Sequence, residues 1–148
     1  MRHGLPLRAN VTVEIRDAAG LLLSTQRQHN LVVTAGRNLV RDLLSNASSA
    51  RLTHLALGTG TATVAATDTT LGTEVFRAAL TSLTASAGKL TAVYYLGTGS
   101  ANGNTLSEAG LFTASSGGTL YARALLASAI VKTAAISATF TWELTFGV

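Results

Sequence analysis

The chain has 148 residues, of which 47% are hydrophobic and only 12% charged, with no cysteine and a formal net charge of +4. Its length fits a single domain, 1–148, and the lack of cysteine excludes disulfide frameworks and thiolate metal sites. The basic residues are scattered without clustered aromatics, and no apolar run could span a bilayer, so we expect neither a nucleic-acid nor a membrane partner.

A strand and a hairpin are predicted near the N-terminus. Apolar and polar residues alternate over residues 7–16, as in a strand with one buried face. The turn sequence DAAG at 17–20 then favours a returning strand over residues 21–28. Residues 1–6 precede this pattern, and we interpret them as an N-terminal arm.

One short helix is predicted over residues 34–46. Four aliphatic residues between positions 39 and 44 form an apolar stripe at helical spacing. Thr34 is placed to cap the N-terminus of this helix, and Asn46 is suited to end it. We expect the stripe to close one side of the sheet core.

Six more strands are expected over residues 52–57, 74–83, 89–96, 105–112, 119–127 and 136–146. Turns rich in Gly, Ser, Asn and Thr separate most of them. Residues 61–70 are nearly all Thr and Ala, and we expect a long surface loop there that contacts something. The sequence therefore predicts a mainly β fold: an antiparallel β-sandwich or small barrel of about eight strands with one short α-helix.

The last of these strands has the clearest pattern. Its even positions are apolar and include Trp142, and its odd positions hold Ser, Thr or Glu. Because the polar row carries a single charge, we interpret four of its members as a candidate interface row: Thr139, Thr141, Glu143 and Thr145.

Two acidic residues, Glu74 and Glu108, stand in uncharged, strand-like surroundings. A carboxylate in such a place needs a partner, and Arg77 and Arg123 lie in similar apolar strands. We expect these residues to form salt bridges, either between subunits or within one chain.

No pattern typical of an enzyme is present. The three histidines and seven acids are isolated from one another along the chain. The GTG sequences at 58–60 and 97–99 lack the Lys-Ser/Thr pair and the helix of a phosphate-binding loop, and no Gly-x-Ser-x-Gly occurs. We therefore expect a protein without catalytic residues, metal or cofactor.

Four segments, taken in order, resemble small structural proteins of tailed bacteriophages. They are NLVVTAGRNL at 30–39, LTHLALGTG at 52–60, AATDTTLGTEVFR at 65–77 and LSEAGLF at 106–112. The chain is most similar to proteins encoded among tail and baseplate genes, including the N-terminal attachment domains of tail-collar fibres, over about residues 30–148. The resemblance implies a non-enzymatic virion component that docks on a symmetric particle, often as a trimer.

The sparse charge fits this expectation, because 12% charged residues is about half the usual share. We expect copies of the chain and neighbouring virion proteins to cover much of its surface. The expected function is that of a tail-associated fibre, adaptor or baseplate component, made in the bacterial host cytoplasm and assembled as a homotrimer in the virion.

Two alternatives stand beside this expectation. The first is a capsid decoration (cement) protein whose N-terminal segment lies over a neighbouring subunit. The second, of another class, is a carbohydrate-binding module with Trp142, Tyr94 or Tyr95 as a stacking platform.

Overall fold

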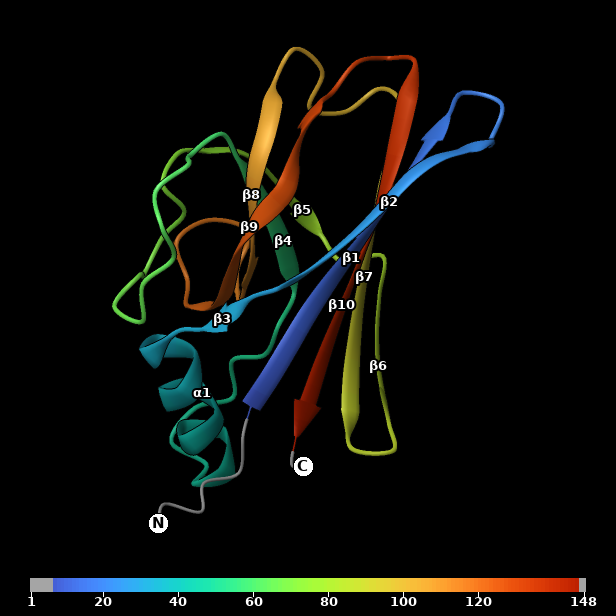
Figure 1. Cartoon of the computed structure of the whole chain (residues 1–148). Coiled ribbons are helices and arrows are strands. Elements are labelled where there is room, and N and C mark those ends of the chain that lie inside the picture. The colour runs from blue at the N-terminus through green and yellow to red at the C-terminus, as the bar shows by residue number, and fades with distance from the viewer. Residues whose placement is uncertain (1–6, 147–148) are drawn as a thin grey trace.

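Two antiparallel sheets of five strands and one helix make up the computed structural model, which describes residues 7–146 (Figure 1). The first sheet has the strand order β2-β1-β10-β7-β6, and the second has the order β3-β9-β8-β4-β5. The prediction of a mainly β fold is confirmed as a β-sandwich, since the two sheets do not close into a barrel. The arm interpreted over residues 1–6 lies outside the described residues.

The strands of the first sheet are β1 (Leu7–Asp17), β2 (Leu22–His29), β6 (Ser82–Ser86), β7 (Lys89–Leu96) and β10 (Ile136–Phe146). The second sheet contains β3 (Leu31–Val32), β4 (His54–Gly58), β5 (Glu74–Ala79), β8 (Thr105–Phe112) and β9 (Leu120–Val131). The helix α1 (Thr34–Leu44) follows β3.

Strands β1 and β10, the first and last of the described chain, lie side by side inside the first sheet. They pair without interruption from Leu7 opposite Phe146 to Asp17 opposite Ile136. Their alternating patterns therefore bury one row each, and Phe140 and Trp142 of β10 are fully buried. Burial of each such aromatic side chain stabilises the fold by roughly 1.5–3 kcal/mol.

The structure has ten strands where about eight were expected. Residues 74–83, predicted as one strand, form β5 in the second sheet and the start of β6 in the first. The chain crosses between the sheets at Leu80, whose N–H donates to the Thr53 carbonyl at 2.9 Å, and at Thr81, whose N–H donates to the Val93 carbonyl at 2.8 Å. The other strand that was not predicted is β3, which has only two residues.

The helix is confirmed, but the predicted cap is wrong. Val33 occupies the N-cap position without a side-chain hydrogen bond, and Thr34 is already the first helical residue. The Thr34 N–H is satisfied instead by the carbonyl of Ala66, 2.8 Å away in a distant loop. At the other end, Asn46 adopts a φ of +58°, a conformation in which Asn is better tolerated than most residues.

Candidate functional site

A buried ion pair lies on the outer face of the second sheet. Glu108 on β8 is completely buried, and Arg123 on β9 is nearly so. The Nε and Nη2 atoms of Arg123 donate to Glu108 Oε2 at 3.0 and 2.8 Å. Arg123 Nη1 also donates to Asp68 Oδ2 at 2.9 Å, which joins the pair to the loop before β5.

That loop, residues 59–73, covers the ion pair with its backbone. The N–H groups of Gly60, Gly72 and Thr73 donate to the two Glu108 oxygens at 3.0, 2.9 and 2.7 Å. A Cβ atom on Gly60 would lie only 2.5 Å from Glu108 Oε1, so this close approach requires glycine. The long Thr/Ala loop therefore contacts the protein's own buried carboxylate.

These contacts keep Glu108 and Asp68 charged. Burial alone would raise the pKa of Glu108, but hydrogen bonds from Thr73, Gly72, Arg123 and Gly60 outweigh it and lower the pKa. The Ala65 N–H, together with Arg123, lowers the pKa of Asp68 against the effect of burial. A carboxylate saturated in this way serves as a structural anion, since no lone pair is left open for a reacting group.

The second predicted pair lies nearby on the same face. Arg77 donates from Nε and Nη2 to the two oxygens of Glu74 at 3.0 and 2.6 Å. Its Nη1 donates to the carbonyls of Ala114 and Gly117, and its guanidinium lies 3.7 Å from the centroid of the Phe112 ring. Arg77 thus ties the β8–β9 turn to β5.

Of the two arrangements expected for these residues, the structure contains the one within a single chain. Glu74 pairs with Arg77, and Glu108 pairs with Arg123. Sequence reasoning did not include Asp68, because an acid in a loop gives no periodic signal of its position.

The candidate interface row lies half-exposed on the outer face of the first sheet. Thr139, Thr141, Glu143 and Thr145 alternate there with the buried residues of β10. Strand pairing places further hydroxyl residues on the same face. We call this the hydroxyl-rich face, made of Thr12, Thr25, Ser82, Thr84, Ser86, Thr91, Thr139, Thr141 and Thr145.

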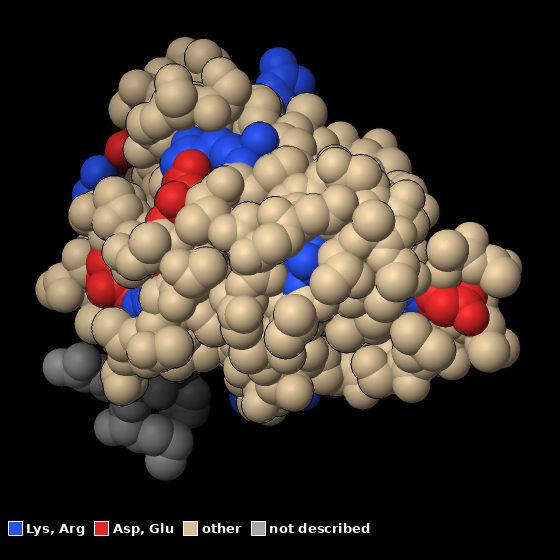
Figure 2. Space-filling view, turned by 90° about the horizontal axis from the view of Figure 1, so that it is seen from above, with Lys and Arg blue, Asp and Glu red and all other residues tan. Residues whose placement is uncertain are grey.

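The carboxylates on this face are paired. Glu14 accepts from Arg16 at 3.0 Å, and Glu143 lies 3.4 Å from Lys89. Two further basic residues, Arg8 and Arg27, lie exposed on the same face. Figure 2 shows one end of the sandwich, where scattered blue and red groups are separated by broad uncharged areas.

Two of the three aromatic residues considered for sugar stacking are buried and therefore cannot stack on a sugar. Trp142 is fully buried and Tyr94 is buried in the same core, so neither ring has a face free for a sugar. Tyr95 is exposed on the outer face of the first sheet. A single exposed tyrosine does not form a stacking platform by itself.

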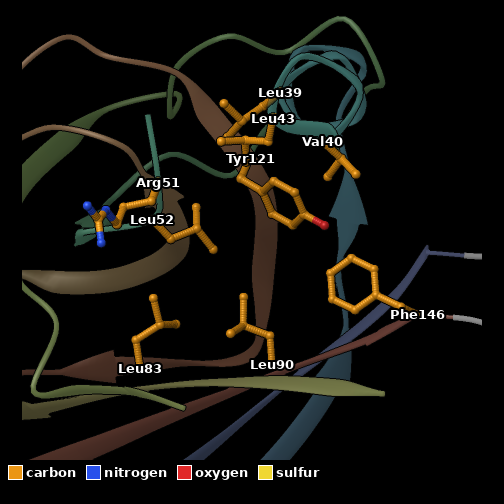
Figure 3. Close-up of a pocket in the computed structure, with 9 residues that line it drawn as sticks. All are labelled: Leu39, Val40, Leu43, Arg51, Leu52, Leu83, Leu90, Tyr121 and Phe146. Carbon is orange, nitrogen blue, oxygen red and sulfur yellow. The ribbon is translucent and has the colours of Figure 1, made fainter. Parts of the chain in front are cut away.

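An apolar pocket, which sequence reasoning missed, lies between α1 and the two sheets (Figure 3). Its volume is about 260 Å³. Leu39, Val40 and Leu43 line it from the helix, and Leu83, Leu90 and Phe146 line it from the first sheet. Tyr121 projects into it from β9, and burial raises the pKa of Tyr121 to about 12, although the charge of Arg37 acts in the opposite direction.

Lys132 is a further buried group without a sequence signal. Its Nζ donates to Asn102 Oδ1 at 2.8 Å and to the carbonyls of Thr133 and Thr98 at 2.9 and 3.4 Å. Burial lowers the pKa of this ammonium group. Lys132 therefore connects the 97–104 turn to residues 132–133, which directly follow β9.

Within residues 7–146, no group of three or more His, Asp or Glu side chains is arranged to hold a metal ion. In the same part of the chain, no helix is long and apolar enough to cross a membrane. No protein-family model, curated protein or solved structure matches the chain.

Proposed function

We propose that the chain is a non-enzymatic structural protein of a tailed-phage virion, associated with the tail as a fibre, adaptor or baseplate component. It assembles with copies of itself, as a homotrimer, and with neighbouring virion proteins. Four sequence segments resemble, in the same order, small structural proteins of tailed phages, and this resemblance supports the virion assignment. The surface of the sandwich supports assembly.

The hydroxyl-rich face carries the proposal. It extends over all five strands of the first sheet, and both of its carboxylates are paired with basic neighbours. Such a face is polar enough to stay soluble before assembly, and its hydroxyl groups cost less to desolvate than charges do when another subunit covers them. The exposed Arg8 and Arg27 on the same face require acidic partners on that subunit. The edge strand β6 also favours assembly, because all five of its residues are exposed and an open sheet edge can pair with another chain.

The paired charges of the second sheet also support the proposal. Loop 59–73 is held in place by the ion pairs among Glu108, Arg123 and Asp68. The β8–β9 turn is held by hydrogen bonds to Arg77, which pairs with Glu74. The pairs that sequence reasoning singled out thus stabilise a rigid building block.

Particle labelling tests this function. Gold-labelled antibodies against the chain are applied to intact particles produced by the genome that encodes it. We expect gold at the tail. Gold on the head would favour the decoration protein instead, and particles free of both gold and the chain would contradict the proposal.

A further inference from the structure

We propose that the chain assembles head to tail: the tip of the β1–β2 hairpin of one copy inserts into the apolar pocket beside α1 of the next copy. This inference rests on the self-assembly in the proposed function and names the surfaces that carry it. The hairpin tip consists of Leu21, Leu22 and Leu23, which we call the leucine tip.

The leucine tip is unusual because three consecutive leucines at a hairpin turn are exposed to solvent. Its three side chains are 66%, 46% and 54% exposed. The turn itself is rigid, because the Asp17 carboxylate accepts hydrogen bonds from the N–H groups of Ala19 and Leu21, both at 2.9 Å. A preorganised apolar projection loses little conformational entropy when it binds.

The apolar pocket matches the tip in size and chemistry. An apolar cavity of about 150 Å³ takes up a molecule as large as benzene. The pocket, at about 260 Å³, therefore has room for at least one leucine side chain. Leu43, Leu83 and Phe146 at its border are exposed, so the apolar surface continues outward and can meet the rest of the tip.

The charges around the two surfaces are complementary. Arg51 lines the pocket, and Arg37 lies close enough to Tyr121 to influence its pKa. No carboxylate partner of either arginine is found among the described residues. The hairpin end carries Glu14, Arg16 and Asp17, and Glu14 pairs with Arg16 at 3.0 Å, so the unbalanced charge there is that of Asp17. Figure 2 shows red groups with blue beside them on the projection at the right, where the hairpin lies in Figure 1. The attraction between Asp17 of one copy and the arginines beside the pocket of the next copy therefore favours insertion of the leucine tip into the pocket.

Geometry excludes insertion of the tip into the pocket of its own chain. Phe146, which lines the pocket, pairs with Leu7 at the start of β1, and the hairpin begins at the other end of that strand. Eleven strand residues separate the two by roughly 33 Å. A contact between different surfaces of two copies closes into a ring, such as a trimer, or continues as a filament.

Sedimentation velocity with complementary variants of the full chain tests the proposal. The tip variant combines Leu21→Ser, Leu22→Ser and Leu23→Ser, with Val131→Ser as its control, because Val131 is an equally exposed strand residue elsewhere. The pocket variant is Leu43→Glu. Its control is Leu44→Glu, the next helical residue, which is more exposed and does not line the pocket. Leu83→Lys blocks the pocket from β6 if Leu43→Glu does not fold.

We expect wild type and both controls to associate with rising concentration, and each variant alone to associate at least tenfold more weakly. An equimolar mixture of tip and pocket variants should form dimers and nothing larger, because one intact tip meets one intact pocket. If wild type associates but the mixture stays monomeric, the head-to-tail contact is wrong and self-assembly uses another surface. If wild type stays monomeric up to its highest soluble concentration, both the contact and the proposed self-assembly are wrong.

Discussion

At the scale of single residues, Glu108 is a charge held on all sides by hydrogen bonds. It is fully buried, but three backbone N–H groups and Arg123 surround its carboxylate. Removing one partner of a buried pair typically costs about 3–5 kcal/mol, because the other charge remains in a place that water cannot reach. Glu108 is therefore a main contributor to the stability of loop 59–73, together with the contacts that Arg123 makes to Asp68 and to the Ala62 carbonyl.

The substitution Glu108→Gln tests that dependence. It leaves Arg123 with Asp68 as its one remaining counter-charge and turns an amide NH2 toward backbone donors, so we expect a loss of roughly 3 kcal/mol in urea unfolding. The control is Glu143→Gln, which removes the carboxylate of an exposed pair with Lys89 and should cost at most about 1 kcal/mol. Equal effects of the two changes would contradict the role assigned to Glu108.

Acid should weaken the fold through the same residues. The pKa values of Glu108 and Asp68 are lowered in the folded state from ordinary values of 4.5 and 3.8. In the acid range the unfolded chain then binds more protons, so their contribution is fully present above about pH 4.5 and is lost as the pH falls through the folded-state values. Unfolding free energies measured from pH 6 to 3 should show this decline, and Glu108→Gln should make it shallower. An unchanged slope in the variant would contradict this explanation.

The paired residues show what sequence reasoning could find at this scale. Glu74, Arg77, Glu108 and Arg123 were singled out because each is a charge in an apolar strand, a pattern visible in the sequence. The backbone donors from residues 60, 72 and 73 were not, because an N–H group is common to nearly all residues and only the tertiary fold brings these three together. The leucine tip was interpreted as ordinary strand, although three consecutive leucines break the alternation.

At the scale of elements, the contact between α1 and β9 is made through Gly36. A Cβ atom added at Gly36 would overlap the backbone carbonyl of Tyr121, so the helix can lie directly on the strand only with glycine there. This contact positions Leu39, Val40 and Leu43 along the apolar pocket. Helix placement and pocket shape are therefore coupled.

The substitution Gly36→Ala separates packing from helix propensity. Propensity alone would stabilise the helix by up to about 1 kcal/mol, whereas overpacking against the strand costs typically 1–3 kcal/mol. We expect net destabilisation in thermal unfolding. The control, Gly99→Ala, has nothing within 4 Å of the added atom and should change stability by less than about 0.5 kcal/mol. A more stable Gly36→Ala protein would contradict the packing argument.

Element boundaries were predictable where the pattern was local. Strands β1 and β10 alternate so regularly that periodicity alone located them. The division between β5 and β6 was not predictable, because residues 74–83 contain neither Gly nor Pro and the change of sheet is set by contacts with Thr53 and Val93. The helix start at residue 34 was predicted correctly, but the capping role of Thr34 was not, since its N–H is bonded by the Ala66 carbonyl from outside the helix.

At the scale of the whole molecule, the hydroxyl-rich face is the surface that we propose neighbours cover. Thr141 lies near the middle of β10, flanked by Thr12 and Val93 on the adjacent strands. The substitution Thr141→Arg should leave folding intact, because the side chain is only half-buried, but it introduces a charge that a covering subunit must desolvate.

Incorporation into particles measures this effect. We expect Thr141→Arg to reduce the amount of chain in purified particles several-fold, as judged by immunoblot. Ser116→Arg, at the exposed β8–β9 turn, should be incorporated like wild type. Full incorporation of Thr141→Arg would show that this face remains open to solvent in the assembly.

The central claim is that a sandwich with so few charges is covered by other copies of itself, and the molar mass in solution tests it most directly. Light scattering on the purified chain across a wide concentration range should give a mass that rises from 15.2 kDa toward three times that value or beyond. A mass that stays at 15.2 kDa up to the solubility limit would contradict the account.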